Sequence, residues 1–148
     1  REGDELLFLP SGKSSRVASL ESFPGPPPAS FGPGRHAGFS LSEQVHLRRG
    51  EVAVRLTDPP CRTALRLLAR IFWLGKRPFR ADREYGLRLG TQKVRMELEA
   101  VRRILNADTL EVQTGEEVRR NDVGEVVLRL QRPVAFDLLP MCPIWDVL

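Results

Sequence analysis

The sequence predicts an all-β protein made of two small antiparallel β-barrels, and three observations predict it. Apolar and polar residues alternate with a period of two through residues 92–100, as expected for a strand with one buried and one solvated face. Further short apolar runs are bounded by turn-forming residues. The segment Thr-Asp-Pro-Pro at residues 57–60 then breaks the pattern. We therefore place one domain at residues 1–58 and a second at residues 59–148.

The first two strands are expected at residues 5–9 and 15–21, joined by turn residues 10–13. In the second strand the alternation places Val17 on one face and Leu20 on the other. Arg1 lacks the context of a strand or helix start, so we expect the first residues to continue a larger unit.

Residues 23–34 are expected to form a loop, because five prolines and three glycines exclude an ordinary helix or central strand. After this loop, residues 37–41 can form a strand. Residues 47–54 are predicted to form a polar turn that leads into another strand.

The central region, residues 63–101, is predicted to contain a long strand followed by a β-hairpin. Residues 62–74 also fit an amphipathic helix, and the aromatic and β-branched residues near Trp73 favour a strand. We expect Phe72 and Trp73 to be core residues rather than base-stacking platforms. The hairpin turns at Gly90-Thr91, with Gln92 and the apolar residues that follow it on one face.

Beyond the hairpin, residues 109–112 and 125–130 are predicted strands. A charged loop separates them, and its turn is assigned to Asn121, Asp122 and Gly124. Residues 133–137 are expected to form an edge strand, because Pro133 cannot donate a ladder hydrogen bond.

Positive charge is concentrated in the middle of the chain. Residues 61–103 carry 12 basic and 4 acidic side chains, against 7 and 7 before them and 4 and 8 after them. Such a region either is a solvated surface or binds an anionic partner such as RNA or an acidic protein. Cys61 and Cys142 are not closely spaced, so we expect a reduced, cytoplasmic protein. No apolar run reaches the roughly 20 residues of a membrane span, which predicts a soluble protein.

No motif in the sequence predicts catalysis. Ser11-Gly12-Lys13-Ser14 resembles the end of a P-loop, but Leu7 stands where that loop needs glycine, and a hairpin turn is favoured. His36 and His46 lack the spacing of a zinc site, and Cys61 has no evident base. The acidic pairs at residues 82 and 84 and at residues 116–117 are expected to be solvated. We name no catalytic, cofactor-binding or metal-binding residue.

Residues 6–17, 36–41 and 45–52 resemble the second, β-barrel domain of translation-factor-type GTPases. Residues 73–74, 77–80, 85–91, 121–124 and 133–137 resemble their third domain, most closely in the large subunit of sulfate adenylyltransferases, a form of which is fused to adenylylsulfate kinase. His46 stands where an aspartate is common in the family, and residues 138–148 depart from its pattern. The resemblance implies a barrel like domain II of elongation factor Tu, incomplete at its N-terminus, followed by one like domain III.

The resemblance also implies a function. In this family GTP hydrolysis drives the formation of adenylylsulfate from ATP and sulfate by a small catalytic subunit. The present sequence would supply a non-catalytic barrel region that couples domains and docks the partner. It would hold no cofactor itself, and GTP and Mg²⁺ are expected in a GTPase domain in cis that this sequence lacks. The alternative is a tRNA-binding barrel region of an elongation factor-like GTPase, although neither nucleic acid nor membrane is the expected partner.

Overall fold

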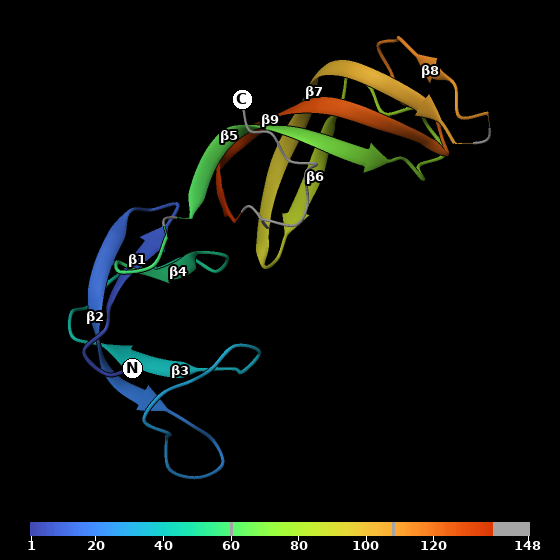
Figure 1. Ribbon diagram of the computed structural model, residues 1–148. Helices are drawn as coiled ribbons and strands as arrows, with labels where there is room; N and C mark the ends of the chain where they lie inside the picture. Colours follow the sequence, from blue (N-terminus) through green and yellow to red (C-terminus); the bar gives the residue numbers. More distant parts are fainter. Residues whose placement is uncertain (60, 108, 138–148) are drawn as a thin grey trace. The chain divides into compact units, whose positions relative to one another are not determined.

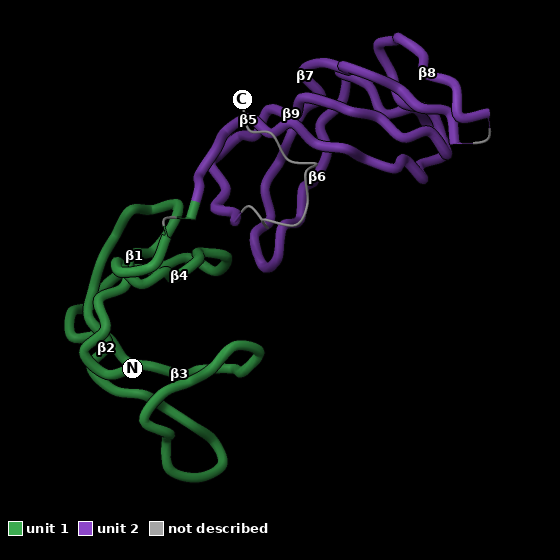
Figure 2. The backbone as a smooth tube through the Cα atoms, viewed as in Figure 1, with its two compact units in different colours: residues 1–61 green, residues 62–148 purple. Residues whose placement is uncertain are grey.

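A computed structural model describes residues 1–59, 61–107 and 109–137. Nine antiparallel β-strands account for the regular structure of these residues, and they contain no helix (Figure 1). The all-β prediction is therefore confirmed. The chain divides into two compact units, Arg1–Cys61 and Arg62–Leu148 (Figure 2). The division into domains at residue 58 stays a prediction.

Unit 1 is a four-stranded antiparallel sheet around a small core. Its strands have the spatial order β3-β2-β1-β4, and their bounds are β1 Glu5–Leu9, β2 Lys13–Glu21, β3 Gly38–Leu41 and β4 Val52–Arg55. The four core side chains are Leu6, Phe8, Val17 and Leu20.

A β-bulge in β2 explains how Val17 and Leu20 reach the same core. A regular strand would place them on opposite faces, as the alternation predicts. The pairing of β2 with β3 shifts between Val17 and Ser19, which leaves Ala18 as an extra residue. The expected separation of Val17 and Leu20 onto two faces is therefore wrong, because the bulge changes the phase of the alternation.

Unit 2 is a five-stranded antiparallel sheet with the order β5-β9-β7-β6, in which the short β8 pairs with β7. The strand predicted for residues 62–74 is confirmed as β5, and the Gly90 turn joins β6 to β7 with a positive φ of 57°. The bounds are β5 Arg62–Phe72, β6 Glu84–Leu89, β7 Gln92–Asn106, β8 Val112–Gln113 and β9 Asp122–Phe136.

The core of unit 2 lies against one face of this sheet. Alternate residues of β7 and β9 are buried, as the period-two pattern predicts. Phe79 and Val118 complete the core from two loops, and each is 0% exposed. The buried members of this cluster are Ala69, Phe79, Val94, Met96, Leu98, Val118, Val126, Leu128, Leu130 and Val134.

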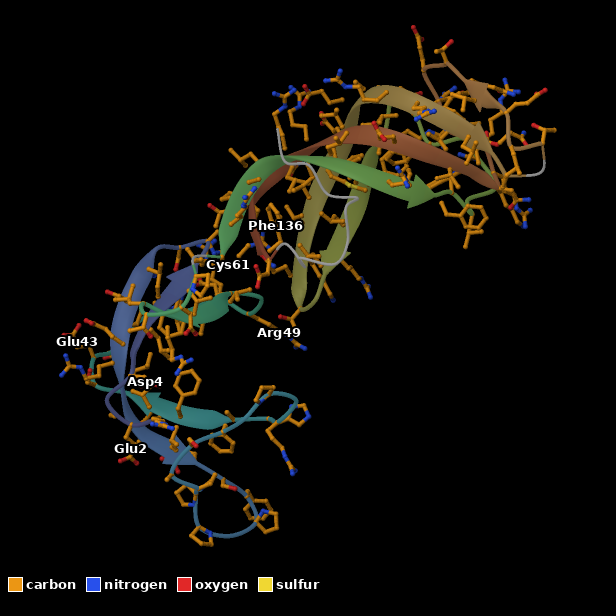
Figure 3. The ribbon with its side chains drawn as sticks, viewed as in Figure 1. Glu2, Asp4, Glu43, Arg49, Cys61 and Phe136 are labelled. Carbon is orange, nitrogen blue, oxygen red and sulfur yellow. The ribbon has the colours of Figure 1, made fainter. Side chains whose placement is uncertain are left out.

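Residues 133–136 form the end of β9 rather than a separate edge strand. Ala135 and Phe136 pair with Thr63 and Arg62 of β5, whereas the ladder with β7 ends at Leu130, so this end of β9 is paired with a strand on one side only. The register between β5 and β9 shifts after Ala64, and Pro133 lies at that irregularity. The irregularity and the absence of a strand partner on the β7 side both tolerate the missing amide of Pro133, as the sequence predicts for an edge position. Figure 3 shows the Phe136 side chain at this end of β9.

One strand assignment, residues 109–112, and one turn assignment also need correction. Only Val112 and Gln113 form β8, because Asn106 accepts the Leu110 amide at 2.9 Å and Leu110 has a positive φ of 58°. Gly124 lies within β9 and not in the preceding turn, which Asn121 forms with a φ of 69°. A Cβ atom on Gly124 would lie 2.5 Å from the Val118 Cγ2 atom, so glycine permits this packing.

Phe72 was predicted to be a core residue, and this prediction is wrong. Its side chain is 54% exposed, whereas Trp73 is partly buried against the core cluster. Adjacent residues of a strand point to opposite faces, so only one of the two can reach the core. Trp73 packs on the rings of Phe79 and Tyr85, with centroid distances of 4.9 and 5.8 Å.

Candidate interaction surfaces

The Ser-Gly-Lys-Ser segment forms the turn between β1 and β2. The Gly12 amide donates to the Phe8 carbonyl oxygen at 2.8 Å, and Lys13 Nζ donates to the His46 carbonyl oxygen at 2.6 Å. Lys13 is the first residue of β2, so a strand follows where a phosphate loop needs a helix N-terminus. The hairpin-turn interpretation is confirmed, and this segment does not fit a nucleotide phosphate.

The histidines do not converge with other metal-ligand types. His36 and His46 are exposed, and Cys61 is partly buried. Across residues 1–59, 61–107 and 109–137, no three His, Cys, Asp or Glu side chains form a group that could hold a metal ion. Cys142 lies outside the described residues. The expectation that the chain holds no catalytic, metal or cofactor site stays a prediction.

The structure brings two of the acidic loops together. Phe79 and Val118 form an isolated β-bridge through two backbone hydrogen bonds of 2.9 Å. The bridge places Asp82 and the Glu116-Glu117 pair around a cavity of about 550 Å³. Glu84 lies instead on β6 and forms an ion pair with Arg95 at 3.1 Å.

Arginines hold the carboxylates around this cavity. Arg80 donates to both carboxylate oxygens of Asp82, at 2.7 and 2.6 Å, and this hydrogen bonding raises the pKa of Arg80 above its ordinary value. Arg119 donates to Glu117 at 3.3 Å. These ion pairs hold the carboxylates in place around the cavity.

The outer face of unit 2, opposite the core, is organised in rows across the strands. Directly paired residues of an antiparallel sheet share a face, so the register defines each row. Charged and apolar rows alternate: Arg66, Arg129, Glu97 and Glu84; then Leu68, Val127 and Ala100; then Arg70, Glu125 and Arg103; then Phe72, Val123, Leu105 and Val112.

Ion pairs on this face engage three of the twelve basic side chains of residues 61–103, Arg66, Arg70 and Arg95. Each of them faces a glutamate on another strand of the sheet, which balances the charge of that arginine. The ion pairs of this face are Arg66–Glu99 at 2.5 Å, Arg70–Glu125 at 3.8 Å, Arg95–Glu84 at 3.1 Å and Arg129–Glu97 at 3.2 Å. In the apolar row between them, the Val127 side chain of β9 is only 1% exposed.

The tip of the β6–β7 hairpin differs from the rest of this face. Arg88 of β6 lies directly opposite Lys93 of β7, and both side chains are exposed. The Arg132 guanidinium donates to the Lys93 carbonyl oxygen, which adds a third cation. We call Arg88, Lys93 and Arg132 the hairpin-tip cluster.

Unit 1 presents an apolar hollow of about 580 Å³. Leu6, Val17 and Leu20 of the core reach it, together with Phe31 and Phe39 from the loop and β3. Its lining also includes charged groups, among them Arg55, which donates two hydrogen bonds of 3.0 Å to Asp58.

Asp4, which also lines the hollow, lies in the segment before β1 (Figure 3). The backbone nitrogen of Arg1 donates a hydrogen bond of 2.9 Å to the Asp4 carboxylate.

The fold and these surfaces define a class of antiparallel β-barrel domains that carry interaction surfaces. Residues 66–144 match the family described as GTP-eEF1A C-terminal domain-like, and the chain belongs to that family. The crystal structure of sup35 complexed with GMPPNP superimposes with a TM-score of 0.77 over 93% of this chain and 34% of that one. At 14% sequence identity, this similarity confirms the translation-factor type of fold.

Curated relatives share sequence along nearly the whole chain. Sulfate adenylyltransferase subunit 1 of Aeromonas hydrophila subsp. hydrophila is 34% identical over 137 residues, which cover 93% of this chain and 28% of that protein. The same subunit of Tolumonas auensis is 30% identical, covering 93% and 29%. The chain thus spans less than a third of the length of these relatives.

None of the described residues forms a helix long and apolar enough to cross a membrane.

Proposed function

We propose that this chain is the non-catalytic β-barrel region of a sulfate-activating GTPase, the large subunit of sulfate adenylyltransferase. The observation that carries the proposal is the similarity to sulfate adenylyltransferase subunit 1 over 137 residues, which crosses both units. In such an enzyme GTP hydrolysis drives a small subunit to form adenylylsulfate from ATP and sulfate. The barrel region couples the GTPase domain to that subunit and docks it.

The surfaces of the chain support a binding role. The described residues present exposed apolar side chains on the outer face of unit 2 and a cationic hairpin tip, and they contain no grouped metal ligands. The Ser-Gly-Lys-Ser segment is a hairpin turn and does not fit the phosphates of GTP. We assign nucleotide binding to a GTPase domain in cis, and the cytoplasm as the location.

The alternative, a tRNA-binding region of an elongation factor, has weaker support. Electrostatic binding of RNA needs cations that are free to neutralise phosphates. Three arginines of residues 61–103, Arg66, Arg70 and Arg95, instead form cross-strand ion pairs with glutamates.

The proposal is tested with the full-length protein and the small subunit from the same organism. Formation of adenylylsulfate from ATP and sulfate should require both proteins and should be accelerated by GTP but not by a non-hydrolysable analogue. An elongation factor would instead bind aminoacyl-tRNA, with affinity that falls steeply between about 50 and 200 mM salt. Failure of the pair to form adenylylsulfate would contradict the proposal.

A further inference from the structure

We propose that the hairpin-tip cluster is a docking surface for a carboxylate-rich segment of a partner protein. Arg88, Lys93 and Arg132 supply the positive charge of this surface. The inference names the place of docking, and so it rests on the function proposed above.

The arrangement of the cluster is costly for the isolated sheet. Arg88 and Lys93 are direct cross-strand partners, and like charges in that position destabilise an antiparallel pair. The hydrogen bond from Arg132 to the Lys93 carbonyl oxygen brings a third positive charge to the same site. A surface selected only for stability would place a carboxylate among these three cations.

Elsewhere on the same face direct cross-strand partners also share a charge, but each of those side chains has an ion-pair partner of opposite charge. These like-charged partners are Arg66 with Arg129 and Glu84 with Glu97. Arg66, Arg95 and Arg129 each form an ion pair with a glutamate on another strand. By contrast, no carboxylate in the described part of the chain pairs with Arg88, Lys93 or Arg132. The charge of these three side chains is therefore available to solvent ions or to a partner that binds there.

The surroundings favour a protein partner over a nucleic acid. Tyr85, the aromatic residue of this hairpin, packs inward on Phe79 with a centroid distance of 4.3 Å, so it offers no stacking platform to a base. Gly86, opposite Arg95, has open space where a Cβ atom would project. The open position leaves room for a partner side chain beside the cluster. The two guanidinium groups and one ammonium of the cluster can bind aspartate or glutamate side chains, and arginine can do so in a bidentate manner.

The test measures binding of the full-length protein to the small subunit from the same organism, at low and at high salt. The variant Arg88→Glu, Lys93→Glu, Arg132→Glu should raise Kd at least about tenfold at low salt, mainly by slowing association. The neutral variant with glutamine at the three positions should give a smaller loss in the same direction, and it keeps the test valid if the charge-reversed protein does not fold.

A matched control reverses three exposed cations of unit 2 outside the cluster, Lys76, Arg102 and Arg120, and changes net charge equally. This control should leave Kd within about threefold of the parent value, because charges away from an interface act mainly through long-range steering. Equal losses in the cluster variant and the control would overturn the inference while leaving the proposed function in place. If the unchanged protein does not bind the small subunit, the proposed function fails as well. Salt-sensitive binding of tRNA that the cluster variant abolishes would also overturn the inference.

Discussion

At the scale of single residues, the Gln92 side chain makes the two hydrogen bonds to β9 that the backbone of a paired strand would otherwise make. Its Nε2 atom donates to the Ala135 carbonyl oxygen at 2.6 Å, and its Oε1 atom accepts the Ala135 amide at 2.9 Å. The ladder between β7 and β9 reaches Met96 and Leu130 and does not extend to Ala135. One buried side chain therefore satisfies both backbone groups of Ala135 on the side of β9 that faces β7.

Gln92→Leu keeps much of the side-chain volume but leaves both Ala135 groups without this partner. The expected loss is about 1–3 kcal/mol of unfolding free energy for each buried group left unpaired, measured by urea denaturation. Gln131→Leu is the control, because Gln131 is exposed and its 2.6 Å hydrogen bond to Glu84 lies in solvent. Equal stability of the two variants would contradict the role given to Gln92.

Gly124 is required by packing, since its position leaves no room for a methyl group beside Val118. Gly124→Ala should cost about 1–3 kcal/mol through overpacking. The double variant Gly124→Ala, Val118→Ala should lose less unfolding free energy than the sum of the two single losses. The shorter side chain at position 118 leaves room for the added methyl group. Gly86→Ala, in the open site of β6, should change stability by no more than about 1 kcal/mol. Additive single and double effects would refute this explanation.

At the scale of strands, the outer face of unit 2 depends on registers that the local sequence pattern does not reveal. Glu99 and Arg102 are extra residues at two irregularities in the pairing of β7 with β9. The first of these places Glu99 within reach of Arg66 on β5, at 2.9 Å from Nε to Oε2. The ion pair therefore joins two strands that lie on either side of β9.

A double-mutant cycle on Arg66→Ala and Glu99→Ala should give a coupling free energy of about 0.2–1 kcal/mol, as for other exposed ion pairs. The coupling should decrease as salt increases from about 0.05 to 1 M, because both groups are partly exposed. The same cycle on Arg70 and Glu125, which are 3.8 Å apart, is the comparison and should give a smaller value. Zero coupling for Arg66 and Glu99 at low salt would contradict the bridge.

The strands themselves were largely predictable, whereas their contacts were not. The alternation from Gln92 to Leu98 determines both the strand and its buried face. Phe79 lies in a basic segment that resembles a turn, and the β-bridge to Val118, distant in sequence, places it in the core. The basic excess was visible in the sequence, but only the register separates the paired arginines from Arg88 and Lys93.

At the scale of the whole molecule, the two units each have a sheet and a hydrophobic core of their own. Their sequence similarity to sulfate adenylyltransferase subunit 1 continues across both of them. The described residues hold no grouped metal ligands, and the P-loop-like segment is a turn. The continuous similarity is the main support for the proposal that the chain is a barrel region of a longer GTPase subunit.

The most direct test of that account is hydrogen–deuterium exchange on the full-length protein, alone and with the small subunit. Binding should slow the exchange of backbone amides within residues 84–95, where the β6–β7 hairpin carries its unpaired cations. Amides of the buried Phe79–Val118 bridge, which are already protected, should serve as the internal control. Protection confined to the GTPase domain, with none in the barrel region, would contradict the account.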